Sequence, residues 1–281
     1  MSSKQTLHPE LKTLLTDLAM GESPRWHNDR LWFSDWGAQE IIAVDMDGSS
    51  EVVVRTPFAL PFCIDWLPDG RLLIVSGREN RIVRREPDGL LVTHVDLHHI
   101  SDQVWNEIVV DGRGNIYVNG GPGIIALVTP DCSAHQVADG IAFPNGMAVT
   151  PDNSTLIIAE SHGKKLTAFD IAADGSLSNR RVWADLGDGV PDGICLDAEG
   201  CVWYADVPNK CCVRVREGGE VKQTVNLNLG CFACMLGGAG RRTLFMVATE
   251  WRGMEKIPEV AQARTGRLLI IEAPAPHVGW P

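Results

Sequence analysis

The sequence lacks any run of about 18 consecutive apolar residues, so it predicts no membrane-spanning helix. Its first fifteen residues contain no apolar stretch of signal-peptide length, and we therefore expect a cytoplasmic protein. Basic residues are also scarce: 25 Lys and Arg oppose 36 Asp and Glu, which gives a formal net charge of −11. Because contacts with phosphates need a basic face, this deficit disfavours nucleic acid as a partner.

Several catalytic and metal motifs are also missing. Neither a G-x-S-x-G nucleophile elbow nor an H-E-x-x-H zinc motif occurs. The eight cysteines are scattered, and the single C-x-x-C at Cys231–Cys234 has no second pair, so we interpret them as buried thiols. No convincing amphipathic helix of ten or more residues is visible, although 44% of the residues are hydrophobic. A large core built from strands is therefore expected.

What the chain does contain is a repeat. Six segments share one pattern, in which an apolar run, a polar turn rich in Asp and Gly, and a second apolar run follow one another, as in a β-hairpin. A third apolar run often follows. The six segments begin at Glu22, Phe62, Asn106, Phe143, Asp192 and Ala233. Because their spacing of about 40 residues is typical of propeller blades, we predict an all-β, six-bladed β-propeller forming one domain over residues 1–281. The segment from Glu10 to Leu18 is a candidate for the strand that closes the ring.

Polar residues recur at one position of this repeat. Asn106, Asn145 and Asp192 each lie eight residues before the turn Gly or Asn, and Glu22 lies one residue out of that register. Innermost blade strands start near one mouth of the channel, so we expect these four side chains to point at one axis. The matching positions in the second and sixth repeats are predicted to be Phe62 and Ala233.

Two carboxylates brought together without a partner repel each other, and a divalent cation removes that cost. Hard cations prefer the oxygen ligands that Asp, Glu and Asn supply. The pattern therefore favours a metal site at the mouth of the channel. The alternative is a set of polar strand starts that line a water-filled channel.

Four short motifs carry a resemblance to a known family. They are Gly21-Glu22-Ser23-Pro24, Trp105-Asn106-Glu107, Phe143-Pro144-Asn145-Gly146-Met147 and Pro191-Asp192-Gly193. In this order they resemble the senescence marker protein/gluconolactonase/luciferin-regenerating-enzyme family. The resemblance implies a six-bladed propeller with one divalent metal held by Glu22, Asn145 and Asp192, and a role for Asn106 in contacting substrate or water. Members mostly hydrolyse sugar lactones, some relatives cleave organophosphates, and the metals associated with them are calcium, zinc, manganese, magnesium and iron.

The sequence departs from the sugar-lactonase pattern around the expected substrate. Val104 stands where the family often has arginine, and Glu107 stands where it usually has aspartate. The segment after Tyr117 is shorter than in relatives whose loop there supplies an acidic contact. Apolar candidates lie nearby instead: Trp36, Phe62, Trp66, Trp105, Phe143 and Met147. We predict substrate contacts from Asn106, Glu107, Trp36, Trp66 and Met147, and a lactone or ester less polar than gluconolactone. The alternative is that the apolar residues pack under the channel rim.

The predicted reaction is metal-dependent hydrolysis of a lactone, a small-molecule ester. The cation would act as a Lewis acid on the carbonyl oxygen, and Asp192 would act as general base toward the attacking water. A water bound to the cation is the alternative base. Two other functions stay open: an organophosphate or aryl-ester hydrolase using the same metal, and a metal-binding propeller scaffold without catalysis.

Overall fold

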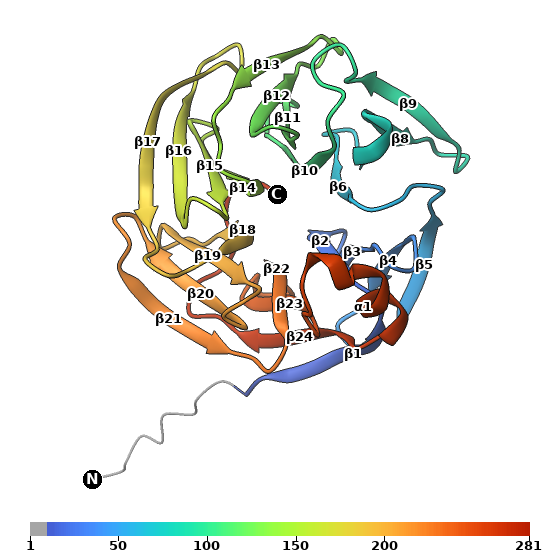
Figure 1. The fold of residues 1–281 in the computed structure, drawn as a ribbon, viewed down its shortest axis with the longest axis vertical. Coiled ribbons are helices and arrows are strands. Elements are labelled where there is room, and N and C mark those ends of the chain that lie inside the picture. The colour runs from blue at the N-terminus through green and yellow to red at the C-terminus, as the bar shows by residue number, and fades with distance from the viewer. Residues whose placement is uncertain (1–9) are drawn as a thin grey trace.

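Six four-stranded antiparallel sheets surround a central axis in the computed structural model, which describes residues 10–281 (Figure 1). The predicted six-bladed propeller is confirmed. The innermost strands are β2 (Gly21–His27), β6 (Phe62–Trp66), β10 (Trp105–Val110), β14 (Pro144–Val149), β18 (Pro191–Leu196) and β22 (Gly230–Gly237). The second strands are β3 (Arg30–Asp35), β7 (Leu72–Ser76), β11 (Ile116–Gly120), β15 (Thr155–Glu160), β19 (Cys201–Asp206) and β23 (Thr243–Thr249).

The outer half of each blade follows in chain order. The third strands are β4 (Glu40–Val44), β8 (Arg81–Arg85), β12 (Ile124–Val128), β16 (Lys165–Ile171), β20 (Cys211–Arg216) and β24 (Gly266–Glu272). In blades one to five the outermost strands are β5 (Ser50–Arg55), β9 (Leu91–Asp96), β13 (Ala134–Ala138), β17 (Leu177–Asp185) and β21 (Val221–Asn226). A short 3-10 helix, η1 (Gly77–Glu79), links β7 to β8.

The ring is closed by β1 (Lys12–Leu18), which forms the outermost strand of blade six. It pairs antiparallel with β24, from Lys12 opposite Ile270 to Leu18 opposite Gly266. Strands from the two ends of the described chain thus share one sheet, as the sequence predicts. Residues 1–9 of the predicted single domain lie outside the described residues.

The core lies between neighbouring blades. Fully buried Trp105 of β10 packs with Cys63 and Val75 of blade two, and fully buried Trp203 of β19 belongs to a cluster that includes Phe245 of blade six. The inner strands β10, β14, β18 and β22 are buried along nearly their whole length, which is why their later residues read as apolar runs. The outermost strands keep one face in solvent, as the largely exposed β5 and β17 illustrate.

An insertion between β23 and β24 forms η2 (Met254–Lys256) and α1 (Ile257–Ala263) at the end of the ring where the inner strands begin (Figure 1). Proline in the first turn favours the start of α1, because its missing N–H would have no partner there in any case. The helix ends at Arg264 in the left-handed conformation. Val260 is buried, and Ala261 approaches Gly37 so closely that a β-carbon on Gly37 would lie 2.7 Å from the Ala261 Cβ.

The C-terminal segment crosses the opposite end of the ring. Trp280 forms an antiparallel bridge with Val149, the last residue of β14, and His277 forms one with Asp197, just after β18. In Figure 1 the C-terminus accordingly lies near the centre of the ring. Within residues 10–281, no helix is long and apolar enough to span a bilayer.

Candidate functional site

The four predicted polar residues occupy one layer of the propeller. Glu22, Asn106, Asn145 and Asp192 are each the second residue of an innermost strand, in blades one, three, four and five. Glu22 is buried, with 4% of its surface exposed, while the other three are partly exposed. Since all inner strands run in the same direction from the same mouth, the fold brings these residues to one end of the channel, as predicted.

The strand register corrects two predicted equivalences. Counted along the inner strands, the second positions of blades two and six are Cys63 and Cys231, rather than Phe62 and Ala233. Blade two has a regular β6–β7 pairing, whereas the inner strands of the other blades carry a register shift near their start. Because blade two lacks the extra residue of that shift, counting residues back from the hairpin turn gives Phe62 instead of Cys63. Both cysteine side chains are buried in the core between blades, and a thiol carries no oxygen. Blades two and six therefore add no oxygen ligand to the ring.

Glycine follows Asn145 and Asp192 because the inner strands approach closely there. A β-carbon on Gly146 would lie 2.6 Å from the Asp192 carbonyl oxygen and 2.6 Å from the Ile194 nitrogen. A β-carbon on Gly193 would lie 2.4 Å from the Ala233 Cβ. Only glycine permits such backbone contact. The Asn-Gly and Asp-Gly pairs thus bring β14 and β18 together immediately behind the two proposed ligands.

The electrostatics of the ring are those of crowded, buried carboxylates. Burial raises the pKa of Glu22 to about 8, and the nearby charge of Glu107 adds to the rise. Burial also raises the pKa of Asp192 well above its ordinary value, helped by the charges of Glu22 and Glu107 and opposed by the side chain of Asn145. Without a cation, each carboxylate therefore costs free energy to ionise.

An unpartnered oxygen provides the test of whether a divalent cation fits. The Oδ1 atom of Asp192 is buried and has no hydrogen-bond partner among residues 10–281. A cation would satisfy that oxygen and remove the cost of charging both carboxylates. The donor set of two carboxylates and a carboxamide is chemically suited to a hard cation. Among residues 10–281 there is no cluster of three or more His, Cys, Asp or Glu side chains that could hold a metal ion. The metal site therefore stays a prediction.

The carboxamides of the ring have few partners inside the protein. Asn106 donates from Nδ2 to the Pro144 carbonyl at 3.4 Å, and Asn145 donates from Nδ2 to Ser161 Oγ at 3.4 Å. Ser161 in turn donates to the Pro191 carbonyl at 2.7 Å, which ties blade four to the start of β18. These long amide contacts leave the Asn106 and Asn145 oxygens suited to accept from, or coordinate, a bound group.

A buried ion pair lies next to the ring. Arg25 Nη2 is 3.0 Å from Glu107 Oε1, and Ser23 Oγ and the Ile108 N–H also donate to that oxygen. Burial raises the pKa of nearby Asp65 to about 6, although Arg25 opposes the rise. Glu107 is thus engaged by protein donors and only 3% exposed, so its predicted substrate contact stays a prediction.

The three apolar residues predicted to contact substrate lie in different surroundings. Trp36 follows β3 at the mouth that holds Glu22, is partly exposed, and donates from Nε1 to the Phe62 carbonyl at 2.7 Å. Trp66 ends β6 at the opposite mouth, where it stacks on His27 with ring centroids 4.2 Å apart. Met147 is 1% exposed and packs between blades. We therefore keep Trp36 in the candidate site and remove Trp66 and Met147.

The alternative of packing under the rim holds for much of the predicted apolar set, since Phe62 and Trp105 are also fully buried. Phe143 is the exception: it is 45% exposed and stacks on His162, with ring centroids 4.4 Å apart. His162 follows β15 at the same mouth.

Sequence reasoning missed an apolar cluster at the same mouth. Its buried members are Met20, Val207 and Phe232, and its partly buried members are Trp36, Trp251 and Ile257. Trp251 and Ile257 come from the insertion after β23, and Trp251 meets Phe232 edge to face at 5.6 Å. The signal available in the sequence was the length of that insertion. Met20 lies two residues before Glu22, so the cluster adjoins the ring.

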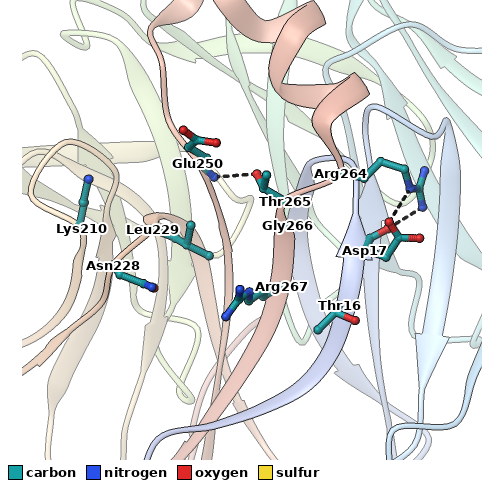
Figure 2. A pocket seen from close by; sticks show the side chains of 10 residues that line it. All are labelled: Thr16, Asp17, Lys210, Asn228, Leu229, Glu250, Arg264, Thr265, Gly266 and Arg267. Atoms are coloured by element: carbon teal, nitrogen blue, oxygen red, sulfur yellow. Dashed lines mark hydrogen bonds and ion pairs between the residues drawn. The ribbon is translucent and has the colours of Figure 1, made fainter.

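A groove of about 420 Å³, lined by residues at the ends of strands in blades five and six, contains none of the predicted site residues (Figure 2). Its two carboxylates have partners of their own: Asp17 pairs with Arg264, and Glu250 pairs with Arg252. Figure 2 shows Lys210 and Arg267 on separate parts of the wall, so they do not converge on one ligand. The predicted site residues lie instead at the channel mouth.

Comparison with known proteins agrees with this architecture. Pentonolactonase XacC of Haloferax volcanii is 28% identical over 222 residues, covering 73% of this chain and 72% of the relative. Regucalcin of Xenopus laevis is 31% identical over 149 residues, about half of each chain. A solved luciferin-regenerating enzyme has the same fold, with a TM-score of 0.82 at 18% identity over 97% of this chain and 98% of that one.

The family model provides the assignment, because it matches most of the chain and all four motif positions. The model described as the SMP-30/gluconolactonase/LRE-like region matches residues 20–250. That span includes every residue of the candidate site except Trp251 and Ile257. The chain therefore belongs to the SMP-30/gluconolactonase/LRE-like family.

Proposed function

We propose that the protein is a hydrolase that opens a lactone ring with the help of one divalent cation at the channel mouth. The observation that carries the proposal is the convergence of Glu22, Asn145 and Asp192, with an unpartnered Asp192 oxygen, in one layer. The named lactonase among the relatives supports the reaction class. When bound, the cation would supply a Lewis acid that polarises the lactone carbonyl and stabilises the charge developing on its oxygen.

The chain's own residues divide the remaining work. Glu22 and Asn145 hold the cation, and Asn106 orients the substrate or a water through its amide oxygen. Asp192 accepts a proton from the attacking water and returns it to the ring oxygen as the carbon–oxygen bond breaks. The products are a hydroxyl group and a carboxylic acid on one molecule, and the acid releases its proton to solvent to become a carboxylate. The tail at Trp280 lies across the far end of the ring, so we place substrate entry at the mouth that holds Glu22.

The apolar cluster supports a less polar lactone than a sugar lactone as substrate. Trp36 and Trp251 are partly exposed and pack against the cluster that contains Met20, which precedes Glu22 by two residues. A site built for many hydroxyl groups needs polar partners for each of them, whereas an alkyl substituent gains by leaving water. We therefore propose an alkyl-substituted lactone rather than a polyhydroxylated one.

An assay across substrate classes tests the proposal. The purified protein, stripped of metal by a chelator and then resupplied with Ca²⁺, Mn²⁺ or Zn²⁺, is offered gluconolactone, alkyl-substituted lactones, aryl esters and a fluorophosphonate. We expect cation-dependent acid release from lactones, faster for the alkyl-substituted ones. Turnover of only the aryl esters or the fluorophosphonate would assign the protein to that hydrolase class instead. No turnover by a cation-loaded protein would favour a non-catalytic scaffold.

The contribution of the apolar cluster is tested by Trp251→Ala, with Met254→Ala as a matched control. Both residues belong to the insertion after β23, but Met254 is 63% exposed and lies outside the cluster. We expect Trp251→Ala to lower kcat/KM for alkyl-substituted lactones by about tenfold while changing that for gluconolactone little. Equal losses on both substrates would reject the apolar subsite.

A further inference from the structure

Three of the six blades end their second strand in a buried carboxylate. Asp35 ends β3, Glu160 ends β15 and Asp206 ends β19, and each is at most 1% exposed. In the strand register they lie opposite the first residues of the inner strands, Gly21, Pro144 and Pro191. Each carboxylate therefore stands next to the segment that leads the chain into an inner strand.

The carboxylates hold those segments by accepting hydrogen bonds from backbone N–H groups. Asp35 accepts from Ala19 at 2.9 Å and from Met20 at 2.8 Å. Asp206 accepts from Val190 at 2.9 Å. Met20 and Val190 each precede a proposed ligand, Glu22 or Asp192, by two residues.

Blade four repeats the device with a longer side chain. Glu160 accepts from the Ala142 N–H at 2.9 Å, and Ala142 precedes Asn145 by three residues instead of two. The side chain of glutamate is one methylene longer than that of aspartate, and the N–H group that it binds lies one residue farther from the proposed ligand. The other oxygen of Glu160 accepts from Thr167 and Arg180, which fixes the carboxylate in turn.

The other three blades have no carboxylate at this position. They carry Ser76, Gly120 and Thr249 there. Ser76 Oγ has no hydrogen-bond partner among residues 10–281, and the Thr249 hydroxyl contacts Thr265 at 3.1 Å. These blades form complete four-stranded sheets, so the fold itself does not require the carboxylate. The carboxylate occurs in the blades that carry Glu22, Asn145 and Asp192.

We propose that Asp35, Glu160 and Asp206 are positioning residues that hold Glu22, Asn145 and Asp192 at the geometry a single divalent cation needs. The inference rests on the proposed function. A hydrogen bond from a backbone N–H to a carboxylate is stronger than one to a neutral acceptor, so it fixes the strand entry more firmly. Groups that hydrogen-bond directly to metal ligands contribute about 10–100-fold to metal affinity in proteins. Asp35, Glu160 and Asp206 act through the strand entry, so we expect an effect near the lower end of that range.

A purely structural role for these carboxylates makes a different prediction, because it alters folding stability and leaves cation affinity unchanged. The two roles are separated by Asp206→Ala and its matched control Thr249→Ala, which changes the equivalent position in a blade without a proposed ligand. For each variant the Mn²⁺ dissociation constant is measured by calorimetry, and the thermal midpoint is measured after chelation. We expect Asp206→Ala to raise the dissociation constant about tenfold or more. Thr249→Ala should leave it within about twofold of the wild type.

Asp206→Asn covers the case in which the alanine variant does not fold. Its amide oxygen still accepts from Val190 without charge assistance, so we expect a dissociation constant between those of the wild type and Asp206→Ala. A wild-type affinity in both Asp206 variants would overturn the positioning role while leaving the cation site intact. A wild type that binds no divalent cation would overturn the proposed function, and the positioning role with it.

Discussion

Arg25 of β2 and Glu107 of β10 form a buried ion pair, 3.0 Å between Nη2 and Oε1, that joins blades one and three next to the ring of proposed ligands. Both residues are at most 5% exposed, and Arg25 Nη2 also donates to the Ile108 carbonyl at 2.7 Å. Glu107 directly follows Asn106, and Arg25 lies three residues after Glu22, so the ion pair joins the two strands that carry these ring members.

We expect Glu107→Gln to lower the free energy of unfolding by about 3 kcal/mol, because it leaves the Arg25 charge buried without its main partner. The measurement is the urea midpoint at neutral pH after chelation. Glu220→Gln removes one partner of the exposed ion pair with Lys222 and should cost less than about 1 kcal/mol. If the two variants lose similar free energies of unfolding, the buried ion pair stabilises the fold no more than an exposed one.

Asp192→Asn should lower lactone turnover by about 100-fold or more, because the amide cannot accept the proton of the attacking water. Asp192 is also a proposed ligand, so turnover is compared at saturating cation, with occupancy checked by elemental analysis. Asp188→Asn, a fully exposed carboxylate before β18, is the control and should retain activity. Near-wild-type turnover by the cation-loaded Asp192 variant would remove the residue from the role of base.

Glu22→Gln should weaken cation binding, since it replaces a buried anionic ligand by a neutral one. At a cation concentration 100 times the dissociation constant, binding stabilises the wild type by about 2.7 kcal/mol, and the variant should lose most of that rise in thermal midpoint. Glu217→Gln, in the exposed turn after β20, should respond like the wild type. An unchanged response in Glu22→Gln would exclude this carboxylate from the site.

His277 makes the far end of the ring sensitive to acid. Burial lowers its pKa from 6.5 to about 3, and the neighbouring Arg241 guanidinium contributes to the decrease. Between those two pH values the unfolded chain binds a proton at this residue that the folded chain does not, so stability falls as the pH falls from about 6.5 toward 3. The contribution of this residue is about 1.4 kcal/mol per pH unit in the middle of the window.

We therefore expect His277→Gln to reduce the dependence of unfolding free energy on pH by about one proton between pH 6 and pH 4. Urea midpoints measured across that interval give the slope. The wild type, measured in the same buffers, is the comparison. If His277→Gln keeps the wild-type slope, the histidine is not the acid-sensitive contact of the C-terminal segment.

Much of the fold could be predicted because three strands of each blade read as apolar runs separated by Asp- and Gly-rich turns. The outermost strands could not be identified in the same way. In β17, for example, the side chains from Ser178 to Val182 are exposed, so burial imposes no apolar pattern on them. Such strands are held chiefly by main-chain hydrogen bonds to the third strand of the blade.

The sequence predicted which residues form the polar ring of the candidate site. Glu22, Asn145 and Asp192 stand at repeated positions, and repetition is visible in a sequence. The register shift near the strand starts is not visible, which is why blade two was misaligned by one residue. Trp66 was wrongly assigned to the site because an apolar motif does not show at which end of the channel its residues lie. The strand β6 begins at one mouth with Phe62 and ends at the other with Trp66.

The supporting carboxylates did have a sequence signal. The second apolar run ends in an acidic residue at Asp35, Glu160 and Asp206, and in a different kind of residue in the other three repeats. That signal acquires meaning only with the register, which sets each carboxylate beside the entry to an inner strand. The chemistry of a residue is readable from sequence, whereas its partner across the sheet requires the structure.

The claim that one divalent cation sits among three oxygen ligands is tested most directly by crystallography of the Mn²⁺-loaded protein, with an anomalous difference map. The account predicts a single strong peak at the channel mouth, within about 2.0–2.6 Å of one side-chain oxygen from each of Glu22, Asn145 and Asp192. A map without a peak there at full Mn²⁺ loading, or with its only peak elsewhere on the ring, would contradict it.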